Sequence, residues 1–254
     1  MHDASDSRHP ILNRLLSVLP PAEFAGIRPH LKDVSFEPGI MLARAGDAIR
    51  TCFFPNSGMI SLLCVTEEGR SIEVGFAGFE GMIGIGVILG KNEMPYDALI
   101  QAPTTGFTAP ADAVLELFNR HGVFHDAALG FAFVVVKQLS QTCVCNHFHT
   151  IEARLCRWLT VMSERWNDRH LKLTHEFLAH MLGVQRTSIG LVANSLQEKG
   201  AIRYSRGRIE ILDLERLRAL ACACYKIVRE ENEKFVAYKG FKPMSDIRQT
   251  IALV

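Results

Sequence analysis

The chain has 254 residues, 28 Lys and Arg against 27 Asp and Glu, and a formal net charge of +1. This length allows two domains with hydrophobic cores of their own, and a hydrophobic content of 48% excludes general disorder. A near-neutral chain also excludes nucleic-acid binding by bulk charge, so any such contact depends on a local basic patch. Basic residues gather in the C-terminal third, at Lys172, Arg186, Lys199, Arg203, Arg206 and Arg208.

The cysteines and the N-terminus indicate the compartment. Seven cysteines, an odd number, lie within apolar runs and not in a loop framework, which favours reduced thiols and a cytoplasmic location. The sequence MHDASDSRHP has no apolar segment typical of a secretory signal. The longest apolar run, 127–136, is shorter than the roughly 20 residues that span a bilayer, so we expect no membrane association.

The N-terminal part is predicted to be helical first and then β-rich. Leucines and isoleucines at helical spacing predict one or two short helices over residues 10–31. From about residue 34 to 110, short β-prone runs alternate with glycine turns. The sequence EEGR at 67–70 predicts a hairpin between two of these runs. The pattern indicates a sandwich or roll of many short strands.

Three helices are predicted next, over residues 111–119, 121–149 and 150–166. The second is apolar on more than one side, which is typical of a helix that packs on several faces. One face is expected to pack on the β domain and another on the same helix of a second subunit. We assign Val135 and Leu139 to the subunit interface.

Residues 173–212 predict a helix, a tight turn, a second helix and a short basic hairpin. Thr174 is expected to cap the first helix, and Gly183 to end it with a positive φ. Gly200 ends the second helix, and a turn with three arginines follows. This order of elements is that of a winged helix-turn-helix, so double-stranded DNA is the predicted partner.

The second helix has one face for the core and one for DNA. Ile189, Val192 and Leu196 are expected in the core because of their helical spacing. The residues predicted to contact DNA are Gln185, Arg186, Thr187, Ser188, Gly190 and Leu191 on the helix, and Arg203, Arg206 and Arg208 in the hairpin, or wing.

The remaining chain is predicted to be further helix over residues 214–238 and then a loose tail. The expected organisation is a β-roll sensor domain over residues 10–120 and a dimerisation helix over 121–150. A winged helix-turn-helix over 151–221 and a C-terminal helical extension and tail over 222–254 complete it.

A β roll, a long helix and a winged helix in this order resemble the Crp/Fnr family of bacterial transcription regulators. The resemblance implies an α+β fold with an N-terminal double-stranded β-helix (jelly-roll-like) sensor domain that is cyclic-nucleotide-binding-like. It also implies a homodimer that reads palindromic DNA and contacts RNA polymerase. It covers about residues 10–215 and rests most on Thr174, Gly183, Arg186, Gly190 and Gly200, with Arg154 before the module.

The family's base-reading positions map to Arg186, Thr187 and Leu191. Arginine is typical of the first position and can bond guanine O6 and N7 together. Glutamate and arginine are usual at the other two positions in the cyclic-AMP-responsive branch. Thr187 and Leu191 are suited to a thymine methyl instead, so the target sequence of the best-known relatives does not carry over.

The sensor domain lacks most of the family's cyclic-nucleotide contacts. Ile85 stands where relatives place a ribose-binding glutamate, and Tyr96 where they place a phosphate-binding arginine. Asp97 would repel a phosphate, and the usual Thr-Ser adenine contacts appear as Leu139-Ser140. We therefore expect neither cyclic AMP nor cyclic GMP and name no cofactor. A pocket at Ile85, Tyr96, Asp97 and Ser140 would suit an apolar or weakly polar molecule, or be filled by side chains.

Cys143, Cys145, His147 and His149 near the end of the long helix form two i, i+4 pairs. Across a dimer, such pairs could supply a Cys2His2 zinc site, or one residue could reach a haem. We expect instead ordinary buried cysteines and histidines that favour the negative end of the helix dipole. No metal site is therefore predicted.

The predicted function is a sequence-specific DNA-binding transcription regulator that acts as a homodimer. The alternative is a cytoplasmic small-molecule or metal/haem-binding sensor module whose C-terminal domain serves protein contacts. The sequence contains no Ser/His/Asp order with a nucleophile turn and no phosphate loop, so an enzyme is not predicted.

Overall fold

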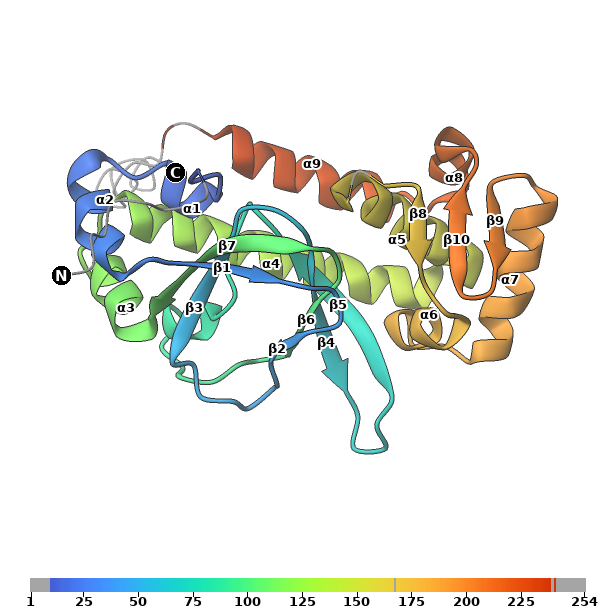
Figure 1. Ribbon diagram of the computed structural model, residues 1–254, viewed down its shortest axis with the longest axis horizontal. Coiled ribbons are helices and arrows are strands. Elements are labelled where there is room, and N and C mark those ends of the chain that lie inside the picture. Colours follow the sequence, from blue (N-terminus) through green and yellow to red (C-terminus); the bar gives the residue numbers. More distant parts are fainter. Residues whose placement is uncertain (1–9, 167, 239, 241–254) are drawn as a thin grey trace, which may run out of the picture. The chain divides into compact units, whose positions relative to one another are not determined.

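The computed structural model describes residues 10–166, 168–238 and 240 (Figure 1). The expected tail after residue 240 and Asn167 in the expected polar link lie outside the described residues. The fold is α+β, as the sequence predicts.

By its internal contacts the chain divides into two compact units, which we describe one at a time. The first unit comprises Met1–Ile60, Ala77–Val136 and Glu231–Val254. The second unit comprises Ser61–Phe76 and Lys137–Glu230.

Two short helices open the first unit, as the leucine spacing predicts. Asn13 caps α1 (Arg14–Ser17) by accepting from two amides of its first turn. The amide of this fully buried side chain also donates to the carbonyls of Pro55 and Gly81, at 2.8 and 2.7 Å. Asn13 thereby fastens α1 to the β strands. α2 (Pro21–Ile27) begins with proline in its first turn, where the missing amide costs no helical hydrogen bond.

Antiparallel strands form the β part of the first unit, as the alternation of short apolar runs and glycines predicts. β7 (Thr104–Pro110) lies between β1 (Lys32–Phe36) and β3 (Thr51–Pro55). β2 (Met41–Ala43) pairs with β6 (Asp97–Ile100). Large apolar side chains of this unit are fully buried, among them Phe54, Met59, Ile60, Met82 and Phe107.

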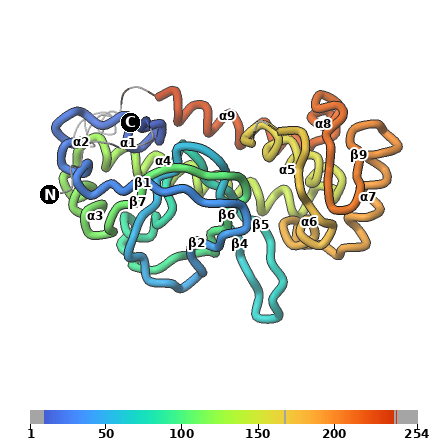
Figure 2. The backbone as a smooth tube through the Cα atoms, viewed as in Figure 1, coloured from blue at the N-terminus to red at the C-terminus, as the bar shows by residue number. Residues whose placement is uncertain are grey.

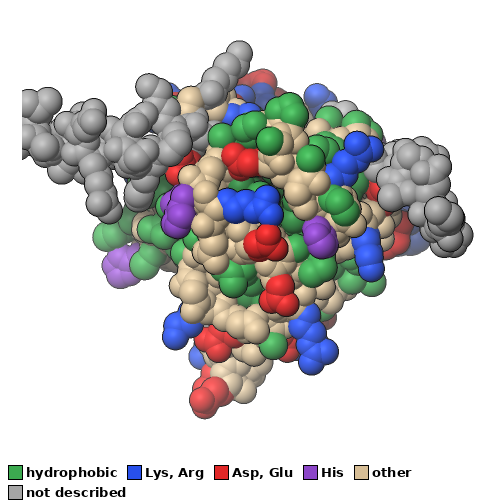
Figure 3. Space-filling model, turned by 90° about the vertical axis from the view of Figure 1, so that its left-hand side faces the viewer, with side chains coloured by type: hydrophobic (Ala, Val, Ile, Leu, Met, Phe, Trp, Pro, Cys, Tyr) green, Lys and Arg blue, Asp and Glu red, His purple; other side chains and the backbone are tan. Residues whose placement is uncertain are grey.

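Two helices follow β7 close to their predicted bounds, α3 (Ala111–Asn119) and the long α4 (Val123–Phe148). The carboxylate of Glu23 accepts from the amides of Val123 and Phe124, at 2.9 and 3.0 Å, and so caps α4. On the side of this unit where α2 and α3 lie, Lys and Arg side chains alternate with Asp and Glu (Figure 3).

α4 is long and apolar enough to cross a membrane, by length and composition alone, which the apolar run 127–136 did not indicate. One third (33%) of its most apolar window is buried. The core helix of a soluble protein passes the same test, so the helix is weak evidence for a membrane. Phe124, Phe131 and Val134 are buried side chains of this helix.

The exposed side of α4 differs from the expected one. Val135 is only 6% exposed, so its assignment to a subunit interface is wrong: it points into the protein core. Leu139 is 37% exposed, and Phe133 and Val136 are 57% and 56% exposed. The apolar side chains that α4 leaves uncovered therefore begin at Phe133 and Val136.

The second unit contains the predicted hairpin, formed by β4 (Ile60–Val65) and β5 (Ser71–Ala77). Gly69 has a φ of 78° in its turn, which only glycine adopts readily. α5 (Ile151–Trp166) follows α4 after a two-residue break and buries Trp158.

The winged module of the second unit has one strand that the sequence did not predict. α6 (His175–Leu182) and α7 (Arg186–Glu198) precede the hairpin of β9 (Ile202–Ser205) and β10 (Arg208–Ile211). β8 (His170–Lys172) joins this hairpin, in the strand order β8-β10-β9. The expected polar link before the module therefore ends in a β strand, β8. Figure 2 shows that the trace of β9 runs beside α7.

The helix expected over residues 214–238 is interrupted by an unpredicted break, because the chain forms α8 (Leu214–Leu220) and α9 (Cys224–Ala237). Ala221 is extended, with a ψ of 149°, and stops α8. Neither glycine nor proline marks this break, so the sequence pattern did not reveal it.

Candidate nucleic-acid interface

The turn between α6 and α7 depends on two residues that the sequence singled out. The Thr174 hydroxyl accepts from the Phe177 amide at 3.1 Å and caps α6. Gly183 has a φ of 62° and a ψ of 41° and ends α6. A Cβ at Gly183 would also lie 2.8 Å from the Ile72 side chain. Glycine is therefore required here by conformation and by space.

The core side of α7 differs in one residue from the prediction. Ile189 and Leu196 are fully buried, as expected, and Ala193 is 1% exposed. Val192 is only half-buried, so its placement in the core is wrong. The helix is rotated slightly from the expected orientation, since Ala193 and not Val192 lies against the core.

The opposite side of α7 presents its N-terminal residues to solvent. Gln185, Arg186 and Thr187 are exposed, and Ser188 and Gly190 are half-buried. Leu191 is 74% exposed, which is unusual for a large apolar side chain in a folded domain. The face therefore offers a guanidinium, polar groups and one apolar side chain to a partner.

The wing turns at Arg206 and Gly207, whose φ angles are 47° and 74°. Two consecutive positive φ angles are typical of the type I′ turn that joins tightly twisted strands. β8 places Lys172 opposite Arg208 across the sheet, so the strand adds a cation to the wing that the sequence did not assign to it. A groove of about 580 Å³ is lined by His170, Leu171, Lys172, Arg203, Ser205, Arg206, Arg208, Ile209 and Glu210.

The wing arginines are not equivalent. Arg203 donates to Glu210 at 2.6 Å, so an acid in the wing already neutralises its charge in part. Within the described part of the chain, neither Arg206 nor Arg208 forms an ion pair. These two side chains therefore carry most of the available positive charge of the wing.

His175 lies beneath the N-terminal half of α7. Its ring stacks on Tyr204, with centroids 4.1 Å apart. Burial, together with the positive charge of Arg186, lowers the pKa of His175 below its ordinary value of 6.5. The imidazole is therefore neutral at pH 7 and adds no charge to the exposed face.

Residues of α5 support α7 from behind. Glu152 accepts from Ser195 at 2.8 Å and pairs with Lys199 at 2.5 Å, and the Lys199 hydrogen bond lowers the pKa of Glu152. The buried guanidinium of Arg154 donates to the Leu182 carbonyl at the end of α6. These contacts hold the end of α6 and the end of α7 against α5.

Three of the four residues expected around a ligand pocket are buried in the first unit, and the fourth is not. Ile85 and Tyr96 are 2% and 4% exposed, and burial raises the pKa of the Tyr96 hydroxyl. Asp97 accepts from the Ala45 amide at 2.7 Å and so supports the end of β2. Ser140 belongs to the second unit and is exposed. A cavity of about 290 Å³ lies elsewhere in the first unit, lined by Val87, Gly90, Lys91, Asn92, Ala111, Asp112 and Leu115.

The cysteine and histidine candidates separate into two pairs. Cys143 and His147 are exposed. Cys145 and His149 lie together with Cys222 and Cys224. Sequence reasoning missed the last two, although their Cys-x-Cys spacing is a signal of its own.

Comparison with known proteins identifies two domains. Residues 33–121 match the family model of a cyclic nucleotide-binding domain. Residues 153–220 match that of a Crp-like helix-turn-helix domain. A comparison with curated protein sequences finds no match.

Solved structures with the same fold cover most of the chain. A putative Crp/Fnr-family transcriptional regulator from Eubacterium rectale is 20% identical, with a TM-score of 0.68 over 81% of this chain and 96% of that one. The c-di-GMP-responsive global regulator CLP of Xanthomonas campestris is 16% identical, with a TM-score of 0.62 over 76% and 100%. A CRP-family transcriptional regulator from Thermus thermophilus is 19% identical, with a TM-score of 0.60 over 74% and 96%.

The expected resemblance is confirmed in both domains. The β domain and the helix-turn-helix match their family models in the order in which the chain presents them. The solved structures of regulators share the fold over a stretch of chain that is long enough to include both domains. The chain therefore belongs to the Crp/Fnr family of transcriptional regulators.

Proposed function

We propose that this regulator binds a specific palindromic DNA sequence as a homodimer in the cytoplasm, and that it acts by binding and not as an enzyme. The observation that carries the proposal is the exposed face of α7 beside the wing. We expect Arg186 at the N-terminal tip of α7 to reach base edges in the major groove, and Arg206 and Arg208 to contact phosphates. We also propose a contact with RNA polymerase, as the family resemblance implies.

Arg186 is proposed to read guanine, because its guanidinium can donate to O6 and N7 together. Thr187 and exposed Leu191 supply methyl groups suited to thymine. The half-site is therefore expected to contain one G·C pair followed by A·T-rich positions. Gln185, Ser188 and Gly190 border the exposed face of α7, and we propose that they contact the sugar-phosphate backbone of the DNA.

The test is selection of bound fragments from genomic DNA by the purified protein, followed by titration of the selected sequence. Arg186→Ala should cost about 1–3 kcal/mol and relax the preference at one G·C pair per half-site. Arg28→Ala removes the same charge from an exposed position of the first unit and serves as the control. A variant at Arg186 that kept wild-type affinity and base preference would show that α7 is not the reading helix.

We propose that the β domain binds neither cyclic AMP nor cyclic GMP, although it matches a cyclic nucleotide-binding family. Buried Ile85 and Tyr96 offer no charge to a phosphate, and an unpaired buried phosphate is heavily penalised. Asp97 is engaged with β2. Isothermal titration with cyclic AMP and cyclic GMP should give no binding in the micromolar range. Saturable micromolar binding that raised DNA affinity would contradict the proposal.

A further inference from the structure

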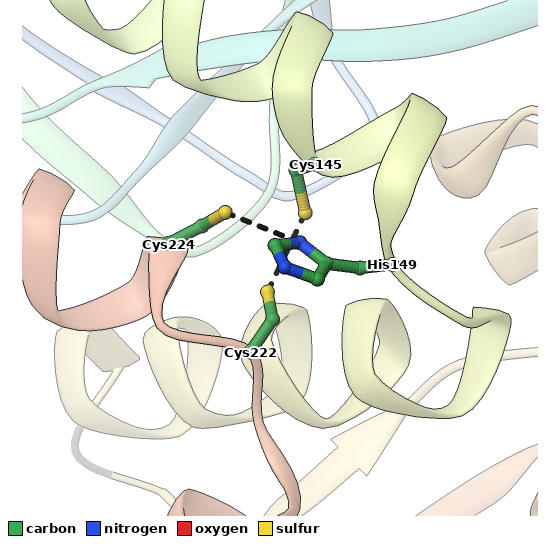
Figure 4. A group of neighbouring side chains, drawn as sticks. All are labelled: Cys145, His149, Cys222 and Cys224. Carbon is green, nitrogen blue, oxygen red and sulfur yellow. Dashed lines mark hydrogen bonds between the residues drawn. The ribbon is translucent and has the colours of Figure 1, made fainter.

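A cluster of soft metal ligands lies in the second unit, away from the residues proposed to contact DNA. It consists of Cys145, His149, Cys222 and Cys224 (Figure 4). One ligand atom of each side chain lies within 4.8 Å of every other. The Cys145 and Cys222 sulfurs are 3.5 Å apart, and the Cys224 sulfur is 3.4 Å from Nδ1 of His149.

The backbone brings the four side chains to one point from two directions. Cys145 lies near the end of α4, and His149 directly follows the last residue of that helix, where its amide donates to the Cys145 carbonyl at 3.2 Å. This helical hydrogen bond keeps the two side chains on one side of the helix end. Cys222 and Cys224 flank Ala223 in the break between α8 and α9. The cluster thus joins segments that are separated by 77 residues in the sequence.

Two of the separations match a single tetrahedral ion, and all the others lie within 4.8 Å. With Zn–S bonds of about 2.3 Å and Zn–N bonds of about 2.0 Å, two thiolates on one ion lie about 3.8 Å apart, and a thiolate and an imidazole nitrogen about 3.5 Å apart. The observed 3.5 and 3.4 Å are close to these values. In an iron–sulfur cluster the four ligands bind two or four different iron atoms. Ligand atoms on different irons lie further apart than ligand atoms on a single ion.

The surroundings compensate the charge of such a site. Three thiolates, one neutral imidazole and a divalent cation carry one net negative charge. Arg154 and Arg157 are 6% and 8% exposed, and the charge of each acts on the thiols of Cys145 and Cys222. The Nε atoms of both arginines are buried without a hydrogen-bond partner among the described residues.

A neighbouring amide supplies a further contact typical of metal sites. Nε2 of Gln141, one turn before Cys145 on α4, donates to the Cys224 sulfur at 3.0 Å. Hydrogen bonds to ligand atoms from the next shell of residues orient the ligands and stabilise the negative charge on sulfur. The three cysteines themselves are buried, with Cys145 fully so.

We propose that Cys145, His149, Cys222 and Cys224 bind one zinc ion as a structural Cys3His site. The ion would fasten the end of α4 to the segment between α8 and α9. Closed four-ligand sites of this type contribute directly to folding stability. The proposal is independent of DNA recognition, since the ligands belong to neither α7 nor the wing.

The first test is elemental analysis of protein purified without chelator. The wild type should contain about one zinc per chain, and Cys222→Ser and His149→Ala should lose most of it. Cys143→Ser and His147→Ala are matched controls, because they remove the same residue types from the exposed side of the same helix end. These controls should retain the zinc of the wild type.

The second test does not require that a ligand variant folds. Wild-type protein stripped of metal and titrated with Co²⁺ should show the visible bands of a tetrahedral site and thiolate-to-cobalt charge transfer. Addition of zinc should abolish both, and a strong chelator should lower the melting temperature of the zinc-loaded protein. Absence of metal, iron with acid-labile sulfide, a Cys145–Cys222 disulfide in the isolated protein, or equal zinc loss in the controls would each overturn the proposal.

Discussion

Glu73 is a buried carboxyl group of the second unit whose protonation affects stability. Ser61 donates to it at 2.5 Å and the Trp158 indole at 3.1 Å. Burial raises its pKa, against the opposing effects of the Ser61 hydrogen bond, the charge of Arg157 and the Trp158 hydrogen bond. The folded protein therefore holds this proton more tightly than the unfolded chain does.

The sign of the pH dependence follows from linkage. A group with a raised folded-state pKa stabilises the fold fully below its unfolded pKa, and this stabilisation is lost as the pH rises through the folded pKa. The free energy of unfolding should thus fall as the pH rises from about 4.5 through the raised pKa of Glu73. Glu73→Gln should remove this decline, measured by urea unfolding across the range. Glu68→Gln, in the exposed turn of the same hairpin, should leave the decline in place.

Arginines that look alike in the sequence have different roles in the structure. Arg203, Arg206 and Arg208 were equivalent candidates by composition, yet only Arg203 pairs with Glu210. The pairing follows from the antiparallel register of β9 and β10, in which Arg203 lies opposite Glu210. The distinction therefore depends on strand pairing and not on the residue type.

At the scale of the element, the wing is expected to contribute affinity without sequence preference. Arg206→Ala should weaken binding to all sequences and reduce the slope of log K against log salt by about 1.8, the value of two phosphate contacts, one from each subunit of the proposed homodimer. Arg203→Ala should have a smaller effect, because Glu210 already neutralises this side chain in part. Fluorescence anisotropy at several salt concentrations measures both. Equal slopes for Arg206→Ala and wild type would show that Arg206 does not contact phosphate.

The elements themselves could be predicted to different degrees. α6 and α7 were predictable, because the Thr174 cap, the Gly183 turn and the apolar spacing act within a few residues. β8 was not, because three residues become a strand only through pairing with the distant β10. The break before α9 was missed for a similar reason, since no residue in it is a helix breaker.

At the scale of the whole molecule, the proposed homodimer is expected to use the exposed apolar side of α4. Phe133 and Val136 lie three residues apart on this helix and are both more than half exposed. A second copy of α4 would cover them, and a palindromic target would require the two copies of α7 to lie about 34–36 Å apart, one turn of DNA. We therefore expect a dimer at micromolar concentration.

Replacing Phe133 and Val136 with glutamate should give monomers in light scattering and abolish tight binding to a palindrome. The introduced charges would be desolvated in the interface, at a cost that a dimer of this kind does not tolerate. Leu12→Glu changes an equally exposed apolar residue of the first unit, at 57%, and should leave the dimer intact. If the double variant remained dimeric, the subunit interface would not include Phe133 and Val136.

Local patterns in the sequence determined the order of the domains, the winged module, the hairpin at 67–70 and the absence of the family's nucleotide contacts at Ile85 and Tyr96. Each of these depends on spacing, turn chemistry or residue type within a short segment, so no distant contact was needed. The side of α4 that stays exposed, the pairing of Arg203 with Glu210 and the approach of Cys222 to Cys145 were decided only by the tertiary structure. The physical reason is that burial, ion pairing and metal-ligand geometry depend on which distant segments pack together. The spacing of residues in the sequence does not indicate which distant segments pack together.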